Sequence, residues 1–281
     1  MSTCTQKFWM YNWNTLENSA TLVSANCVNC RRYWDEDLRA VQRNVCLLDS
    51  YMPTNCPGKF GFLDPILHLK LDDAYASPKV YSDPPVFPQT FLDPGGDPNT
   101  NAHSVAGHVD TALTFDGVDD RIALTAESHQ PYLAADTDFT LALWVKANSP
   151  GPTANLRALS SSEGVAAGMF VGFVNNYYRI RFCTVSGGTP YITYSDSPSP
   201  IDANWHHCAI VRFNYTVTIY FDASVLATST QSQNALIAYT PGTLMNLGST
   251  AVPDKFAPCN LDDLRLYTRA LSAAEIAILA A

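Results

Sequence analysis

Short stretches in which hydrophobic and polar side chains alternate fill the chain after residue 62. In FTLALWVKA (139–147), Phe139, Leu141, Leu143 and Val145 occupy every second position, and YYRIRFCTV, YITYS, HHCAIVRF and TVTIYFDASVLAT continue the theme. A period of two is that of a β-strand with one buried face. Gly, Pro, Asn and Asp separate the stretches, as in antiparallel sandwiches and jelly rolls. The pattern therefore predicts a mainly β fold, an antiparallel β-sandwich.

Two segments of this large part depart from the alternation. Residues 84–101 are rich in Pro, Gly and Asp, which favours a long surface loop over a central strand. At the end of the chain, a strand at 261–267 is followed at once by a change of period. Ser272 and Glu275 there form an S-x-x-E capping box, and Ile276 supplies an apolar side, so we expect a helix to follow the strand.

The first 62 residues differ in composition from the rest. They hold three of the five Trp residues, and KFWMYNW alternates aromatic side chains. YWDEDLRAVQRNVCLLDSY has apolar residues at helical spacing, which predicts one amphipathic helix. The stretch YMPTNCPGKFGF then reads as a linker or tight turn. We therefore predict a small Cys- and aromatic-rich docking module at 1–62, ahead of the large domain at 63–281.

Four cysteines of the N-terminal module allow three interpretations. Cys27 and Cys30 form a C-x-x-C pair, and Cys46 and Cys56 follow it. Four thiolates can bind a tetrahedral zinc ion that stabilises a small module. Disulfides are the alternative in an oxidising environment, and free buried thiols are the third.

The charge of the chain bears on its partners and location. The formal net charge is −9, and residues 63–281 carry eleven basic against twenty-one acidic residues. This excess argues against a nucleic-acid partner. No apolar run approaches the roughly 18 residues that cross a membrane, and the first thirty residues lack the pattern of a secretory signal. We expect synthesis in a cytoplasm without a signal peptide.

Six blocks appear in an order that resembles a known family. They are ILHLKLDD (66–73), ALTFDGVDDRIAL (112–124), DFTLALWVKA (138–147), NWHHCAIVRF (204–213), VTIYFDASVLA (217–227) and LDDLRLYTRALSAAEIAIL (261–279). Their order is similar to that of laminin-G-like, concanavalin A-like jelly-roll domains, over roughly 63–281. One departure is Ala223, which follows Asp222 where the family usually has Gly.

The resemblance implies an arrangement for the ends of the domain. The last strand, 261–267, would lie beside the first, 66–71, and the capped helix would seal one end of the sandwich. In related jelly rolls an aspartate at the position of Asp262 commonly binds a structural calcium ion, with Asp72 and Asp110 as further candidate ligands here. Carboxylate and carbonyl oxygens are the ligands that calcium prefers. The alternative is that Asp262 is solvated or hydrogen-bonded to a turn.

The run WHHC at 205–208 suggests a metal or catalytic site, but its geometry argues against one. Consecutive side chains on a strand point to opposite faces, so His206 and His207 cannot bind one ion. The same Trp-His-His run is a structural element of the resembled family. We therefore expect His206 and His207 to pack, and Cys208 to lie in the core.

Catalysis is not expected. Glucanases of the resembled fold carry an E-x-D-x-x-E pattern, since acid and nucleophile stand about 5 to 5.5 Å apart. The chain has no such pattern, and Asp116, Asp119 and Asp120 in FDGVDD indicate a turn between strands. No nucleophile elbow, Walker loop or dinucleotide fingerprint occurs either.

The resemblance implies recognition of glycans or protein surfaces. Four tyrosines on predicted strands are candidates to stack on sugar rings: Tyr177, Tyr178, Tyr191 and Tyr194. The module at 1–62 ahead of a binding fold suggests a decoration or fibre subunit on a larger assembly such as a virion, as in bacteriophage surface appendages. A free or secreted lectin is the main alternative, and a glycoside hydrolase is a second.

Overall fold

The computed structural model describes most of the large domain and two short segments before it. The described residues are 5–11, 20–26, 65–83, 87–129, 133, 137–148, 154–161, 168–186, 189–230, 245–250 and 254–281. The chain divides into two compact units, Met1–Asp64 and Pro65–Ala281. The predicted amphipathic helix and the four cysteines of the N-terminal module lie outside the described residues, so zinc, disulfides and free thiols there stay predictions.

In the first unit, strand β1 (Thr5–Tyr11) pairs antiparallel with β2 (Ala20–Asn26). The register places Thr5 opposite Asn26 and Tyr11 opposite Ala20. The aromatic stretch that the sequence singled out, KFWMY, therefore lies on a strand.

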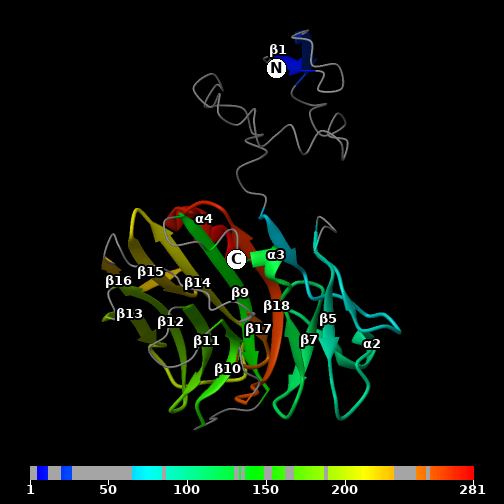
Figure 1. Cartoon of the computed structure of the whole chain (residues 1–281), viewed down its shortest axis with the longest axis vertical. Helices are drawn as coiled ribbons and strands as arrows, with labels where there is room; N and C mark the ends of the chain where they lie inside the picture. Colours follow the sequence, from blue (N-terminus) through cyan, green and yellow to red (C-terminus); the bar gives the residue numbers. More distant parts are fainter. Residues whose placement is uncertain are drawn as a thin grey trace. The chain divides into compact units, whose positions relative to one another are not determined.

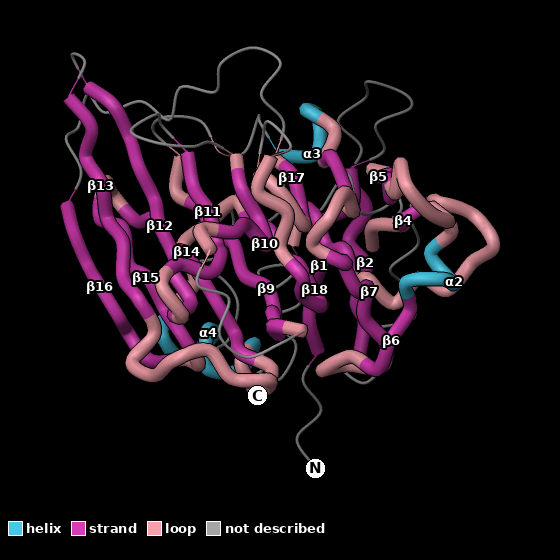
Figure 2. The backbone as a smooth tube through the Cα atoms, turned by 90° about the horizontal axis from the view of Figure 1, so that it is seen from below, coloured by secondary structure: helices cyan, strands magenta, loops and turns pink. Residues whose placement is uncertain are grey.

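The second unit is built from two antiparallel sheets (Figures 1 and 2). In its described residues, the sheet that we call the first sheet has the order β13-β12-β11-β10-β17-β8-β5-β4. Its strands are β4 (Lys79–Val80), β5 (Gln89–Leu92), β8 (Arg121–Ala123), β10 (Leu156–Ser160), β11 (Gly168–Val174), β12 (Tyr177–Ser186), β13 (Thr189–Asp196) and β17 (Asn246–Leu247).

The second sheet has the order β16-β15-β14-β9-β18-β7-β6, and β3 also pairs with β18. Its strands are β3 (Leu67–Leu69), β6 (Ser104–Ala106), β7 (Thr111–Asp116), β9 (Phe139–Ala147), β14 (His206–Phe213), β15 (Thr216–Phe221), β16 (Ser224–Thr230) and β18 (Pro258–Tyr267). Three short helices complete the described elements: α2 (Thr100–His103), α3 (Ala126–His129) and α4 (Ala273–Leu279). No helix in the described part of the chain is long and apolar enough to cross a membrane.

The core lies between the two sheets. Inward-facing side chains such as Leu141 and Leu143 of β9 and Ile180 and Phe182 of β12 belong to one buried cluster. This is the alternation that the sequence displays, and it confirms the prediction of a mainly β sandwich. Strand β5 corrects the prediction for residues 84–101, because it pairs with β4 on one side and β8 on the other.

Helix α4 follows β18, and its capping box is formed. The Ser272 hydroxyl accepts from the Glu275 amide, and the Glu275 carboxylate accepts from the Ser272 amide at 2.8 Å. Ile276 packs with Ala142 of β9 and Ala209 of β14 on the outer face of the second sheet. The helix therefore covers that face (Figure 1). The resemblance had implied instead that the helix would seal one end of the sandwich.

Strand β18 holds the centre of the second sheet. It pairs with β9 on one side, and on the other with β7 along its first half and β3 along its second half. Leu264 lies opposite Leu69, and Leu266 opposite Leu67. The predicted pairing of 261–267 with 66–71 is therefore correct.

Candidate functional site

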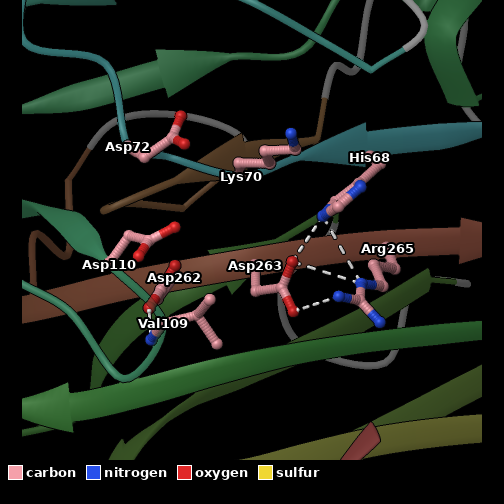
Figure 3. A pocket seen from close by; sticks show the side chains of 8 residues that line it. All are labelled: His68, Lys70, Asp72, Val109, Asp110, Asp262, Asp263 and Arg265. Carbon is pink, nitrogen blue, oxygen red and sulfur yellow. Dashed lines mark hydrogen bonds and ion pairs between the residues drawn. The ribbon is translucent and has the colours of Figure 1, made fainter.

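A polar pocket opens where β3, β18 and the loop between β6 and β7 meet (Figure 3). Its volume is about 230 Å³, and it is lined by His68, Lys70, Asp72, Val109, Asp110, Asp262, Asp263 and Arg265. All three residues that the sequence offered as calcium ligands line this one pocket. They come from positions up to 190 residues apart, and the pairing of the first and last strands brings them together.

An irregularity in β18 shapes the pocket. The register with β9 shifts between Asp262 and Arg265, and Asp263 has a φ of 53°, in the left-handed region. A β-bulge of this kind inserts an extra residue and re-aims the side chains around it. Both Asp262 and Asp263 therefore line the pocket, while Leu264 still faces the core.

Asp262 is buried and held by backbone amides. One carboxylate oxygen, Oδ2, accepts from the amides of His108 at 2.8 Å and Val109 at 2.9 Å. Gly107 allows this approach, because a Cβ there would lie 2.7 Å from the same oxygen. Burial raises the pKa of Asp262 to about 6, although the two amides oppose the shift. Its other oxygen points toward Asp110 and Asp72 (Figure 3).

Asp263 lies in an ion-pair network on the other side of the pocket. It contacts His68 and Arg265, whose Nη2 is 2.6 Å from Asp263 Oδ2. Burial alone would raise the pKa of Asp263, but the hydrogen bond from His68 and the charge of Arg265 outweigh it and lower the pKa. Asp263 is therefore a charged structural residue with its partners in place.

Asp72 and Asp110 are exposed at the mouth of the pocket. Lys70 lies beside them, but its ammonium pairs with Asp83 at 3.3 Å. The carboxylates of Asp72, Asp110 and Asp262 therefore form the negative side of the pocket (Figure 3). Oxygen donors of this type suit calcium, which takes six to eight oxygens at about 2.3 to 2.6 Å.

Two other groups in the described residues have ligand atoms within 4.8 Å of one another: Asp93 with His103 and Asp120, and Asp116 with Asp119 and Asp120. The Asp72, Asp110 and Asp262 carboxylates are not such a group. The sequence analysis missed Asp93, because it treated residues 84–101 as a surface loop, and it did not single out His103, which follows that stretch. The signal was there in the run DPGGDPN, whose two aspartates flank two glycines.

The four candidate sugar-binding tyrosines have different environments. Tyr194 is 56 % exposed on β13, whereas Tyr177 on β12 is half-buried. Tyr178 is 1 % exposed in the core, and its hydroxyl contacts the Ala147 amide at 3.3 Å. The prediction for Tyr178 is therefore wrong, because adjacent strand residues face opposite ways. The side chain of Tyr191 is outside the described ones.

Tyr194 lies among polar groups on the outer face of the first sheet. The guanidinium of Arg179 is 5.1 Å from its ring centre. Arg179 also makes two bonds with Asp196, at 2.6 and 2.8 Å. These bonds fix the cation beside the ring, and Ile192 is 40 % exposed on the same strand. The patch of Tyr194, Arg179, Asp196 and Ile192, the Tyr194 patch hereafter, therefore combines a flat apolar surface with fixed hydrogen-bonding groups.

The WHHC run behaves as a structural element. His207 is 2 % exposed and meets the Trp144 ring edge-on at 5.2 Å. Burial lowers the pKa of His207 to about 4, so it is neutral. His206 faces the other way, and its ring contacts Asp202 and Asp222. Cys208 is fully buried in the core.

Comparison with known proteins agrees with this fold. The family described as the concanavalin A-like lectin/glucanases superfamily matches residues 116–277, more than half of the chain. The chain belongs to this superfamily. No curated protein matches the sequence.

Solved structures similar to this member of the superfamily share little sequence identity with it. Domain 4 of AbnA, a GH43 extracellular arabinanase from Geobacillus stearothermophilus, solved with arabinotriose, has a TM-score of 0.53 and 18 % identity over 78 % of this chain and 98 % of its own. The binding domain of botulinum neurotoxin serotype D has a TM-score of 0.57 and 12 % identity over 78 % of this chain. That of Paraclostridial Mosquitocidal Protein 1 has a TM-score of 0.55 and 13 % identity over 77 %. The match spans 50 % and 52 % of these two toxin chains, and such low identities establish the fold alone.

Proposed function

We propose that the chain is a non-enzymatic binding and adhesion protein. In this proposal the jelly roll of Pro65–Ala281 contacts carbohydrate. The unit Met1–Asp64 attaches it to a larger assembly such as a virion, which displays the jelly roll on its surface as a decoration subunit.

The observation that carries the binding role is the exposed ring of Tyr194 with the fixed Arg179–Asp196 pair beside it. An aromatic face offers an apolar surface for the C–H face of a sugar. The guanidinium and carboxylate beside it offer donors and acceptors for hydroxyl groups. An open surface of this kind suits weak contacts that many displayed copies would add together.

Two structural neighbours lend support through their ligands. The AbnA domain was solved with arabinotriose, and the binding domain of botulinum neurotoxin DC was solved with SialylT. The same toxin domain was also solved with rat synaptotagmin II. A protein surface is accordingly the second class of partner that we consider.

Calcium forms part of the proposal as a structural ion. Asp262 would hold it through the oxygen that faces the pocket, with Asp72 and Asp110 at the mouth as further ligands, reaching the ion by side-chain rotation or through water. A dication there would offset the cost of burying the Asp262 charge, which is what raises its pKa. The ion would stabilise the contact between the first and last strands.

The absence of catalysis is also part of the proposal. Retaining glycosidases need two carboxyl groups that face the substrate. One close group of carboxylates stabilises the turn between β7 and β8, and it consists of Asp116, Asp119 and Asp120. Asp116 Oδ1 accepts a hydrogen bond from the Val118 amide at 2.7 Å, and Asp120 is 2 % exposed. Their positions argue for a structural role.

A glycan array tests the binding role. We expect the full chain to bind, and Tyr194→Ala to lower the signal at least about fivefold, because a lost aromatic contact costs about 1 kcal/mol or more. Tyr75→Ala is the matched control, since Tyr75 is 54 % exposed but lies away from the Tyr194 patch on the segment before β4. Equal loss in both variants, or no binding by the full chain, would contradict the proposal.

Deletion of residues 1–62 tests the assembly role. We expect the shortened chain to keep glycan binding and to lose incorporation into its particle, as measured by co-sedimentation. A chain that is found only free in solution, with strong glycan binding, would instead establish the free lectin.

A further inference from the structure

A second cluster of ligand atoms lies away from the Asp262 pocket, where the loop after β5 meets the turn between β7 and β8. Asp93 follows β5, His103 ends α2, and Asp120 ends the turn. One ligand atom from each of the three lies within 4.8 Å of the others. The fold brings these three residues together from separate segments.

The hydrogen bond of the His103 ring leaves one nitrogen for a ligand. Nε2 lies 2.7 Å from the Asp97 carbonyl oxygen, and a carbonyl only accepts, so Nε2 carries the proton. In the neutral ring, Nδ1 then has a lone pair. It faces Asp120 Oδ2 at 3.6 Å. A metal ion placed between these two atoms would bind both of them.

The ring is also fixed in orientation. It stacks on Phe91 with 4.2 Å between ring centres. The bond from Nε2 to a backbone carbonyl is the second contact that orients metal-binding histidines in proteins. His103 is therefore held with Nδ1 toward the carboxylate before any ion arrives.

Asp120 supplies an independent observation. It is 2 % exposed, and while Oδ2 accepts from the Asp116 amide at 2.8 Å, Oδ1 has no hydrogen-bond partner among the described residues. A buried carboxylate oxygen without a donor is costly, and a bound cation would satisfy it.

The loop after β5 is built closely around the cluster. A Cβ on Gly96 would lie 2.3 Å from Asp93 Oδ2, and a Cβ on Gly95 would lie 2.8 Å from Asp119 Oδ2. A side chain at either glycine would have to displace the carboxylate beside it. The glycines therefore keep backbone and acidic groups at close range.

The spacing fits one ion. Ligand atoms bonded to zinc at about 2.0 to 2.2 Å in a tetrahedron stand about 3.4 Å apart. The Nδ1 to Asp120 Oδ2 separation is 3.6 Å, too long for a hydrogen bond and close to that value. An imidazole with two carboxylates suits zinc or a neighbouring transition metal better than calcium, which prefers oxygen alone.

We propose that Asp93, His103 and Asp120 bind a divalent transition-metal ion of the zinc class. Asp93 Oδ2 lies 3.5 Å from the other ring nitrogen, Nε2, so the Asp93 carboxylate would reach the ion by side-chain rotation. Water would complete the coordination. The ion would tie the loop after β5 to the turn between β7 and β8. This site is distinct from the Asp262 pocket and does not depend on glycan binding.

Cobalt(II), the spectroscopic substitute for zinc, tests the site in the full chain. We expect Asp120→Asn and His103→Gln each to lower the affinity of one cobalt site at least about tenfold in calorimetric titrations. His206→Gln is the matched control, because His206 also lies between two aspartates and should leave the site unchanged. Any cobalt held by Cys27, Cys30, Cys46 or Cys56 would show thiolate charge-transfer bands, and it would be the same in all variants.

Unchanged cobalt affinity in both variants, or an equal loss in His206→Gln, would overturn the proposal. Circular dichroism shows whether each variant is folded. Should Asp120→Asn fail to fold, His103→Gln and Asp93→Asn carry the test, because neither side chain is fully buried. In that case, a cobalt affinity in those two variants equal to that of the wild type would overturn the proposal.

Discussion

Two histidines of the jelly roll each lie between two aspartates, and they differ in distance. His206 Nδ1 is 2.7 Å from Asp222 and its Nε2 is 3.0 Å from Asp202, so both nitrogens are hydrogen-bonded to carboxylates. His103 Nδ1 is 3.6 Å from Asp120, and its Nε2 is 3.5 Å from Asp93 and bonds a carbonyl instead.

This difference in histidine–aspartate distance decides whether a proton or a metal ion can lie between the two side chains. At His206, both ring nitrogens are close enough to a carboxylate to share a proton with it. Burial lowers the pKa of His206, but the hydrogen bonds to Asp222 and Asp202 outweigh burial and raise this pKa above its ordinary value. At His103, the wider separation between Nδ1 and Asp120 leaves room for a metal ion. The same residue types thus form an ion-pair network at one place and a set of metal ligands at the other.

The largest effect expected is from zinc. An ion that binds only the folded state at about 100 times its dissociation constant adds about 2.7 kcal/mol to the free energy of unfolding. We expect this rise in wild type and in His206→Gln, and its loss in His103→Gln, in urea titrations with and without zinc. A rise of equal size in all three chains would place the ion elsewhere.

We expect calcium to bind at Asp262, and its stabilising effect to be independent of His103 and His206. At about ten times its dissociation constant it would add about 1.4 kcal/mol. Thermal unfolding in calcium and in chelator should show the rise in wild type and in His103→Gln, and none in Asp262→Ala. Identical midpoints for wild type in calcium and in chelator would refute a calcium site.

The charge on Asp262 also predicts a pH dependence without calcium. Because burial raises its folded pKa to about 6, above the ordinary value of 3.8, its contribution to stability is present below pH 3.8 and is lost as pH rises through 6. Asp262→Asn should remove this part of the fall between pH 4 and 7, by about 1.5 kcal/mol, which is half of the full shift because water screens the charge. Urea titrations across this range measure it, and an unchanged slope in the variant would contradict the assignment.

His206 predicts a pH effect at higher pH. Its raised pKa means that its ion pairs stabilise the fold fully below about 6.5, the unfolded value, and that this stabilisation is lost as pH rises through the folded pKa. Since Asp202 and Asp222 are about half exposed, we expect about 1 kcal/mol. His206→Gln should flatten stability between pH 6 and 9, whereas His103→Gln in chelator should keep the slope.

The smallest effect concerns the hairpin that carries Asp222. Asp222 and Ala223 have φ values of 46° and 62°, in the left-handed region that Gly adopts without strain. Ala223→Gly should relieve part of this strain and raise the free energy of unfolding by about 0.5 kcal/mol, with His206 and Asp222 still paired. Gly at an unstrained strand position, Ala227→Gly, is the control and should destabilise.

Local patterns predicted most of the fold, and contacts between distant segments account for what they missed. Alternation predicted β9 and β14, and the capping box of Ser272 and Glu275 predicted α4. The bulge at Asp263 depends on one backbone angle that no side-chain pattern displays, so no sequence pattern indicated that Asp263 lines the same pocket as Asp262.

The errors have similar causes. Tyr177 and Tyr178 are identical neighbours, and only the packing of β12 decides which one faces the core. Asp93 and His103 meet Asp120 because β5 and β8 pair in the first sheet. The run DPGGDPN displays its aspartates, but nothing in it indicates the pairing of β5 with β8, so the cluster that depends on this pairing was missed.

The position of β18 has a consequence for how this unit folds. Strand β18 is synthesised well after its partners β3, β7 and β9. The second sheet cannot close while residues 258–267 remain in the exit tunnel, so the earlier strands wait for their common partner. Pairing over such sequence separations is slow. The nascent chain must therefore keep its exposed apolar strands from aggregating until β18 arrives.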